Sequence, residues 1–101
     1  MIVYNVTTNI TWAIHNDWLQ WVQAEHIPRV MQTGCFSESR ILRLLEIDDE
    51  DGPTYAIQFH ASTTQNYHRF IEQHAGHIQK HSREKWRDQM IEFSSVMEVL
   101  H

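Results

Sequence analysis

The sequence of 101 residues predicts one α+β domain, residues 1–101, with elements in the order β-α-β-β-α-β. Three observations carry this prediction. Apolar residues recur at every second position in four segments, which is typical of half-buried strands. They recur at every third or fourth position in two segments, as in amphipathic helices. An acidic stretch ending in Gly52-Pro53 separates the second and third strands, as expected of a hairpin loop.

The first strand and the first helix follow from the opening residues. MIVYNVTTNI alternates apolar and polar residues and predicts a strand. Thr11 is a candidate N-cap for a helix that runs to about residue 25. Pro28 lacks an amide donor and crowds the carbonyl of Ala24, so we expect this helix to kink or break at His26-Ile27. Gly34 is the expected C-terminal cap. The apolar stripe of this helix is Ile14, Trp18, Trp21 and Val22.

The middle of the chain predicts a β-hairpin. Residues 35–47 alternate with mixed character on both faces, which fits a strand that is partly covered by a partner. Residues 48–53 hold four acids, and we interpret them as a solvated turn, because their spacing is not that of a calcium loop. Residues 54–61 alternate again and predict a third, antiparallel strand.

The last third of the chain predicts a long helix and a final strand. Ser62 or Thr63 is the expected N-cap of a helix that runs to about Trp86, with Gly76 as a weak point inside it. Residues 90–100 predict the fourth strand. The apolar stripe of this helix is Tyr67, Phe70, Ile71, His74, Ile78 and Ser82.

Two right-handed crossovers would place both helices on one face of a four-stranded antiparallel sheet with the strand order 4-1-3-2, a ferredoxin-like sandwich. The opposite face is then bare and aliphatic, and monomers rarely expose such a patch. We therefore expect a homodimer with a shared β-barrel-like core, formed through the open sheet face. The expected open face carries Val3, His60, Val96 and either Ile41 and Leu45 or Leu42 and Leu44.

Composition excludes several classes of partner. The formal charge of −5, with scattered Lys and Arg residues, argues against nucleic-acid binding. The N-terminal segment lacks the basic start and apolar run of a signal peptide, and no window is apolar enough to span a membrane. Cys35 is the only cysteine, so an intrachain disulfide is impossible and a cytoplasmic location is expected.

The segments MIVYNVT, WLQWVQAEHIPRVMQTGCF, SRILRLLEIDDEDG and TYAIQF resemble a small bacterial family of similar length that has no assigned function. This family is similar to the dimeric α+β-barrel superfamily, and the resemblance covers nearly the whole chain. Other branches of the superfamily include cofactor-independent quinone-forming monooxygenases, haem-degrading enzymes, muconolactone isomerase-like proteins, chlorite dismutase relatives and stress-responsive barrels. The resemblance implies the fold and does not select a reaction.

His26 is the first candidate for chemistry, because a helix disturbed by Pro28 can open a pocket in which an imidazole acts as base or donor. In several superfamily branches, a polar residue late in the first helix points into such a cleft. The alternative is a structural histidine that satisfies freed carbonyls. An aromatic cleft suited to a planar ligand, with ordinary core packing as its alternative, is a second candidate site. Its residues are Tyr4, Trp18, Trp21, Tyr55 and Phe59, and polar groups such as His74 could converge on it with His26.

The histidines of the second helix raise the question of a metal. His77 and His81 have the i,i+4 spacing that chelates a metal, but Lys80 lies beside them and the glutamate of a zinc-protease motif is missing. No haem-specific pattern surrounds these histidines, and Cys35 has no neighbouring base. We therefore predict no metal and no cofactor.

Three functional hypotheses remain open. The first is a homodimer that binds a small apolar or aromatic molecule between helices and sheet, at Tyr4, Trp18, His26, Tyr55 and His74. The second is a cofactor-independent monooxygenase-like or isomerase-like enzyme that uses His26. The third is a non-catalytic structural or regulatory dimer whose core is filled.

Overall fold

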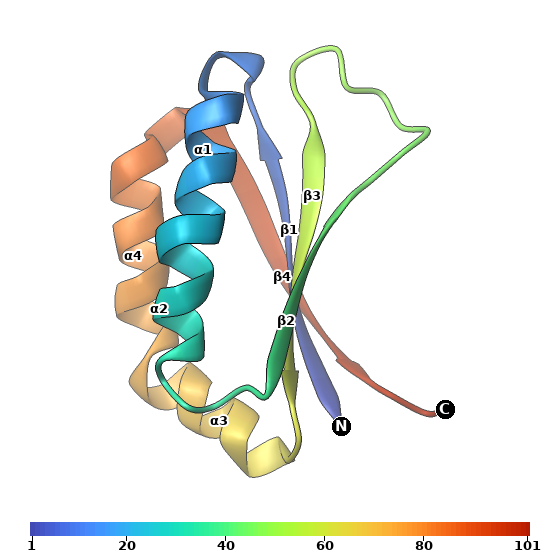
Figure 1. Cartoon of the computed structure of the whole chain (residues 1–101), viewed down its shortest axis with the longest axis vertical. Coiled ribbons are helices and arrows are strands. Elements are labelled where there is room, and N and C mark those ends of the chain that lie inside the picture. The colour runs from blue at the N-terminus through green and yellow to red at the C-terminus, as the bar shows by residue number, and fades with distance from the viewer.

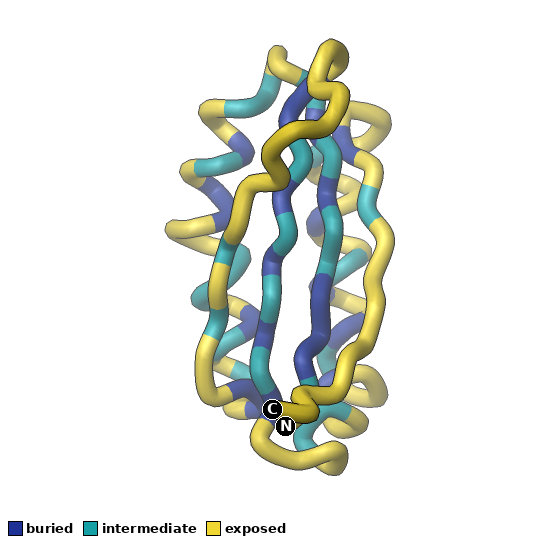
Figure 2. Tube along the Cα trace, turned by 90° about the vertical axis from the view of Figure 1, so that its right-hand side faces the viewer, coloured by how far each residue is buried: buried dark blue, intermediate teal, exposed yellow.

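The computed structural model describes residues 1–101 and contains a four-stranded antiparallel sheet with the order β2-β3-β1-β4. All helices cover one face of this sheet, and the other face is uncovered (Figures 1 and 2). The predicted ferredoxin-like fold and its strand order are thus confirmed. The strands are β1 (Ile2–Ile10), β2 (Glu38–Arg43), β3 (Thr54–Ala61) and β4 (Met90–Glu98). The helices are α1 (His15–Trp21), α2 (Ile27–Met31), α3 (Thr64–Gln73) and α4 (Ala75–Trp86).

Strand register determines which side chains face the helices. Tyr4 of β1 lies opposite Phe59 of β3 and opposite Val96 of β4. Residues directly opposite each other in an antiparallel pair share a face. Val96 therefore lies on the helix side, and its predicted place on the open face is wrong. Val3 and His60 lie on the open face as predicted. The remaining large apolar side chains of the open face are Leu42, Ile91, Phe93 and Met97.

The core fills the layer between helices and sheet. Trp18, Phe59 and Phe70 are its largest fully buried side chains. Tyr4 lies among aromatic neighbours from strand, loop and helix, including Phe36 and Phe70. Burial of rings of this size supplies most of the hydrophobic stabilisation in a small domain.

The first helix does not break at His26-Ile27, where the sequence predicts a kink or a break. Instead, α1 continues into a π-helical turn over Val22–His26, and this turn leads directly into α2. The amide of Ile27 donates to the carbonyl of Val22, five residues earlier. One wide turn of this kind relieves the crowding between the proline ring and the preceding turn, so the helix stays continuous. Gly34 follows α2 with a φ of 75°, as expected of a C-terminal cap.

The predicted second helix is divided. Thr63 caps α3 by accepting a hydrogen bond of 3.1 Å from the amide of Asn66. The chain leaves helical geometry at His74, with φ −126° and ψ −37°, and α4 then begins at Ala75. The prediction of one uninterrupted helix is therefore wrong. The break turns Ala75 inward, five positions after Phe70, and moves His74 away from the buried stripe.

Strand β2 is shorter than the predicted segment 35–47. It begins at Glu38, since Cys35 and Phe36 are buried in the core instead of pairing in the sheet, and it ends at Arg43. Strand β4 likewise ends at Glu98 and not at residue 100.

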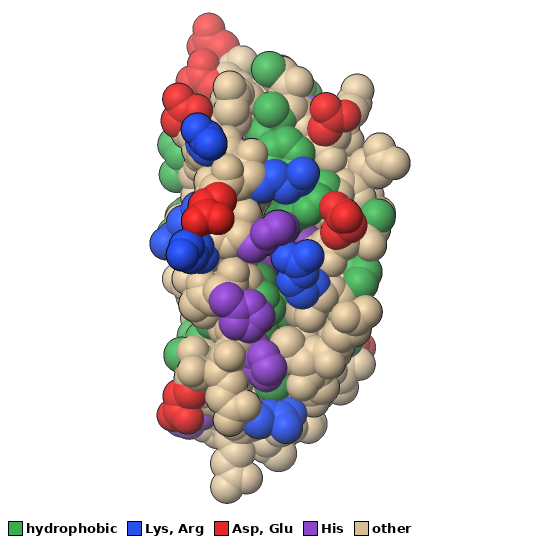
Figure 3. Space-filling model, turned by 90° about the vertical axis from the view of Figure 1, so that its left-hand side faces the viewer, with side chains coloured by type: hydrophobic (Ala, Val, Ile, Leu, Met, Phe, Trp, Pro, Cys, Tyr) green, Lys and Arg blue, Asp and Glu red, His purple; other side chains and the backbone are tan.

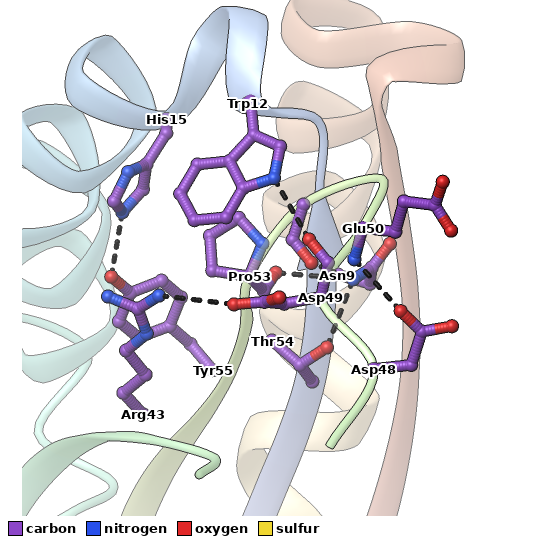
Figure 4. A network of polar contacts seen from close by, with 11 residues as sticks. Asn9, Trp12, His15, Arg43, Asp48, Asp49, Glu50, Pro53, Thr54 and Tyr55 are labelled. Atoms are coloured by element: carbon purple, nitrogen blue, oxygen red, sulfur yellow. Dashed lines mark hydrogen bonds and ion pairs between the residues drawn. The ribbon is translucent and has the colours of Figure 1, made fainter. Parts of the chain in front are cut away.

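Figure 4 shows the acidic loop between β2 and β3, which is held to the start of the first helix. The indole Nε1 of Trp12 donates to the carbonyl oxygen of Asp49 over 2.9 Å. The side-chain nitrogen Nδ2 of Asn9 donates to the carbonyl oxygen of Gly52 over 3.1 Å. The loop is therefore solvated at its tip and anchored at its end.

Gly52 is the residue most sensitive to substitution in this loop. A Cβ atom at Gly52 would lie 1.6 Å from the carbonyl oxygen of Ile10. We expect Gly52→Ala to lower the free energy of unfolding by at least about 2 kcal/mol, because backbone must move to remove the clash. Gly76→Ala is the matched control. A Cβ there meets no atom within 4 Å, so this variant should gain about 0.5 kcal/mol from helix propensity. Urea unfolding measures both, and equal stability of the two variants would contradict this account.

Candidate functional site

A cavity lies between the sheet and the helices, over β1, β3 and β4 and beneath the π-helical turn, α2, α3 and α4. The space between atoms in and around it is about 470 Å³, and this value includes open solvent at its mouth. The apolar side chains that line it are Val6, Val30, Phe59, Phe70 and Ile78, whereas the side chain of Phe93 lies on the open face of the sheet. The polar side chains are Tyr4, His26, Gln79, Ser82, Arg83, Glu92 and Ser94. A mostly apolar pocket with a few convergent polar groups is the usual form of a small-molecule site.

His26 is the last residue of the π-helical turn and lines the cavity. Its Nδ1 lies 3.5 Å from the Ser82 hydroxyl oxygen, and its ring stacks on Trp21 with centroids 4.9 Å apart. Burial lowers the pKa of His26 from 6.5 to about 4, and the positive charges of Arg29 and His81 act in the same direction. The imidazole is therefore neutral at pH 7, and it is a weaker proton acceptor than a free imidazole.

Tyr4 lies on β1, a central strand of the sheet, and also lines the cavity. Its hydroxyl oxygen accepts a hydrogen bond of 3.1 Å from the Gln79 side-chain nitrogen on α4. Burial raises the pKa of the Tyr4 phenol above its usual value, although hydrogen bonds with Gln79 and Ser94 oppose this change. The phenol is thus a neutral group that can donate a hydrogen bond into the cavity.

Glu92 occupies a helix-facing position of β4, opposite Thr8. Its Oε1 lies 3.9 Å from the Nε of Arg83 on α4, which is an ion pair without a close hydrogen bond. Burial raises the pKa of Glu92, and the charge of Arg83 partly offsets this effect. The carboxylate is therefore held in a place where its charge is poorly solvated.

Only three ionisable groups in the chain have clearly shifted pKa values, and Tyr4, His26 and Glu92 all line this one cavity. In each case, burial is the largest cause of the shift. Perturbed groups cluster at functional sites, because binding and catalysis use polar groups that are kept from water. The arrangement offers a neutral base, a hydrogen-bond donor and a carboxylate around an apolar floor.

The structure brings together two of the predicted ligand-binding residues, Tyr4 and His26. Trp18 and Tyr55 lie away from the cavity in the core, with their ring centroids 5.2 Å apart. The Tyr55 hydroxyl lies 2.7 Å from Nε2 of His15 (Figure 4). His74 lies at the break between α3 and α4 and does not line the cavity.

The sequence analysis missed most of the polar wall. The sequence predicts no role for Gln79 or Arg83, and it places Ser82 on the inner stripe of the helix without a role. Glu92 and Ser94 carried a usable signal. They occupy alternating positions of β4 that face the helices, where apolar residues are the rule, so polar residues there indicate a polar pocket.

The helix histidines and the lone cysteine do not extend the site. His74 and His77 have ring centroids 6.0 Å apart, and no group of three or more His, Cys, Asp or Glu side chains is arranged to hold a metal ion. Cys35 is buried, with its Sγ 3.8 Å from the carbonyl oxygen of Thr33. No helix combines the length and apolarity needed to cross a membrane.

The fold and the cavity define a ferredoxin-like α+β protein with a pocket between helices and sheet. Residues 1–100 match the model of DUF4286, a domain of unknown function, and the chain belongs to this family. A comparison with curated proteins found no significant match.

Several solved structures share the fold. An ethyl tert-butyl ether D (EthD) family protein from Bacillus halodurans has a TM-score of 0.72 at 9% identity, over 99% of this chain and 100% of that chain. SnoaB, a cofactor-independent oxygenase from Streptomyces nogalater, has a TM-score of 0.67 at 15% identity, over 99% and 94%. A dimeric ferredoxin-like protein from an uncultured marine organism has a TM-score of 0.62 at 13% identity, over 100% and 96%. At these identities, the similarity shows the fold alone.

The lowered pKa of His26 makes a testable contribution to the pH dependence of stability. Between about pH 6.5 and pH 4, the unfolded chain binds a proton at His26 and the folded chain does not, so this contribution is complete above pH 6.5 and is lost as the pH falls. Between pH 7 and about pH 4.5, wild type should lose up to about 2 kcal/mol more than His26→Gln. Urea unfolding at a series of pH values measures the difference. An NMR titration that places the imidazole pKa near 6.5 would contradict this account.

Proposed function

We propose that this protein binds a small, mostly apolar aromatic molecule in the cavity between helices and sheet. The observation that carries the proposal is the meeting of three desolvated ionisable groups, Tyr4, His26 and Glu92, above a floor of aromatic and aliphatic side chains. Such a site takes a ring into its apolar part and orients it by hydrogen bonds at the polar wall. We further propose that residues 1–101 act as one domain and, from the lone Cys35, that the protein works in the cytoplasm.

The ligand site can be tested by filling it. Val6→Phe places a ring in the cavity, whereas Val96→Phe makes the same change on the same side of the sheet at a position that does not line it. Wild type and Val96→Phe should both bind benzamide and phenol. Changes in the amide chemical shifts measured by NMR report this binding. It should be lost in Val6→Phe.

If neither compound shifts the amides of cavity residues in wild type, the ligand proposal fails. The third hypothesis, a structural or regulatory dimer with a filled core, then becomes the better account.

The second candidate function is catalysis by His26. A neutral imidazole beside a buried phenol and a carboxylate can remove a proton from a bound phenol or enol, after which molecular oxygen can accept electrons from the resulting anion. The structural likeness to a cofactor-independent oxygenase supports this candidate by analogy of fold only. Oxygen uptake with hydroquinone, which would yield quinone and hydrogen peroxide without added metal or flavin, separates catalysis from simple binding. His26→Gln should abolish this uptake if the imidazole is the base.

We also propose that two copies of the chain pair through their open sheet faces. Ile91 and Phe93 on this face are 70% and 65% exposed, and Leu42 and Met97 are also exposed there. In the middle of the face, the side-chain oxygen of Asn5 is buried without a hydrogen-bond partner. A twofold dimer would cover the apolar side chains of both copies with the same patch. The dimeric ferredoxin-like protein with the same fold supports this assembly by analogy.

A charge placed on the open face tests the dimer. Phe93→Lys should convert a dimer into a folded monomer, because burying an unpaired ammonium between two sheets is costly. Ile71→Lys is the matched control, since Ile71 is exposed on α3 and should not affect assembly. Light scattering after size-exclusion chromatography measures the mass. A monomeric wild type at micromolar concentration would refute the proposed pairing.

A further inference from the structure

Resting on the proposed ligand site, we propose that its ligand is a single-ring aromatic carboxylate, with the ring among Phe59, Phe70 and Val30 and the charge held by Arg83. Three features of the cavity mouth support this ligand. They are the weak pairing of the Arg83 side chain, the charged side chains around the mouth and the position of Glu92.

Arg83 is a cation at the mouth that its partner holds only weakly. Its side chain is 66% exposed, whereas that of Glu92 is 16% exposed, and the two groups approach no closer than 3.9 Å. A guanidinium prefers two parallel hydrogen bonds to a carboxylate, and this pair does not supply them. A ligand carboxylate that reached the mouth could supply them by drawing Arg83 over the cavity.

The surface around the mouth favours an anion, although the net charge of the chain is −5. Figure 3 shows His side chains and some of the Lys and Arg side chains along the middle of the helix-covered face, whereas other Lys and Arg side chains lie at its border together with most of the Asp and Glu side chains. Arg29 and His81 lie close enough to His26 to lower its pKa, and Arg83 lines the cavity itself. Local fields of this kind steer charged ligands independently of net charge.

Glu92 distinguishes an anionic ligand from a cationic one. The charged and titratable groups that line the cavity around it are Arg83 from α4, Tyr4 from β1 and His26 from the π-helical turn, and Arg83 is the only cation among them. When a carboxylate captures Arg83, the buried Glu92 loses its partner and its pKa rises further, so ligand binding should take up a proton. His26, with a pKa of about 4, stays neutral meanwhile. A cationic ligand would instead pair with ionised Glu92 and bind more tightly at high pH.

The test compares three probes of one shape. Benzoate, benzamide and benzylamine are titrated into wild type by NMR at pH 6.5. We expect benzoate to bind about tenfold more tightly than benzamide, since a charge-assisted pair replaces a neutral contact, and benzylamine to bind most weakly. The affinity for benzoate should fall between pH 6.5 and pH 8.

Substitutions of Arg83 and Glu92 test whether these two residues cause the preference for benzoate and its pH dependence. Arg83→Gln should remove the preference for benzoate over benzamide. Lys80→Gln is the matched control, because Lys80 is an exposed cation of the same helix that does not line the cavity. Glu92→Gln should keep the preference but abolish its dependence on pH.

The outcomes separate this inference from the proposed function. If benzamide binds and benzoate binds no better, or if Arg83→Gln keeps the preference, the carboxylate inference is overturned while the ligand site stands. If benzylamine binds best, the site selects a cation and the inference is also overturned. If none of the probes binds, both proposals fail together.

Discussion

Tyr4 is the side chain on which both the core and the cavity depend. Its ring lies 5.6 Å from that of Phe70 on α3 and 6.4 Å from that of Phe59 on β3, measured between centroids. The same side chain places its hydroxyl at the cavity, where Gln79 of α4 donates to it. One residue in the central strand thus ties two helices to the sheet and also contributes polar chemistry. The aromatic packing decides how far the helices stand from the sheet, and the space left beside it is the cavity.

The cavity is a compromise between burial and solvation. Hydrophobic packing favours closing the helices on the sheet, but the carboxylate of Glu92 and the imidazole of His26 lose hydration when they are enclosed. The chain relieves this conflict only in part, through a long ion pair to Arg83 and a long contact to Ser82. Groups left in this state can gain more from a suitable ligand than groups that are already fully paired. This difference supports a binding role more than a purely structural one.

The uncovered side of the sheet, visible in Figure 2, presents the opposite situation. Apolar side chains such as Ile91 and Phe93 face solvent there without a covering layer. The two faces of the sheet also differ in the effect that a substitution would have. Substitutions of the helix-side residues that line the cavity alter it, whereas open-face substitutions leave the cavity unchanged unless the sheet itself is disturbed. The placement of His60 and Val3 on one face and Tyr4 on the other follows from single-residue alternation along β1 and β3.

The sequence by itself determined the strand order, the side of the helices and the polarity of most strand positions, because periodicity and crossover handedness are local or nearly local rules. It also identified His26 as a candidate, since a proline two residues later predicts a disturbance of the helix at that point. Only the tertiary structure decided that Pro28 widens the helix into a π turn, that the chain breaks at His74, and that Arg83 meets Glu92 across nine residues of sequence. These outcomes depend on how α4 lies against β4 and on how tightly the aromatic core packs. Such distances are set by many side chains at once and leave no pattern in any single segment.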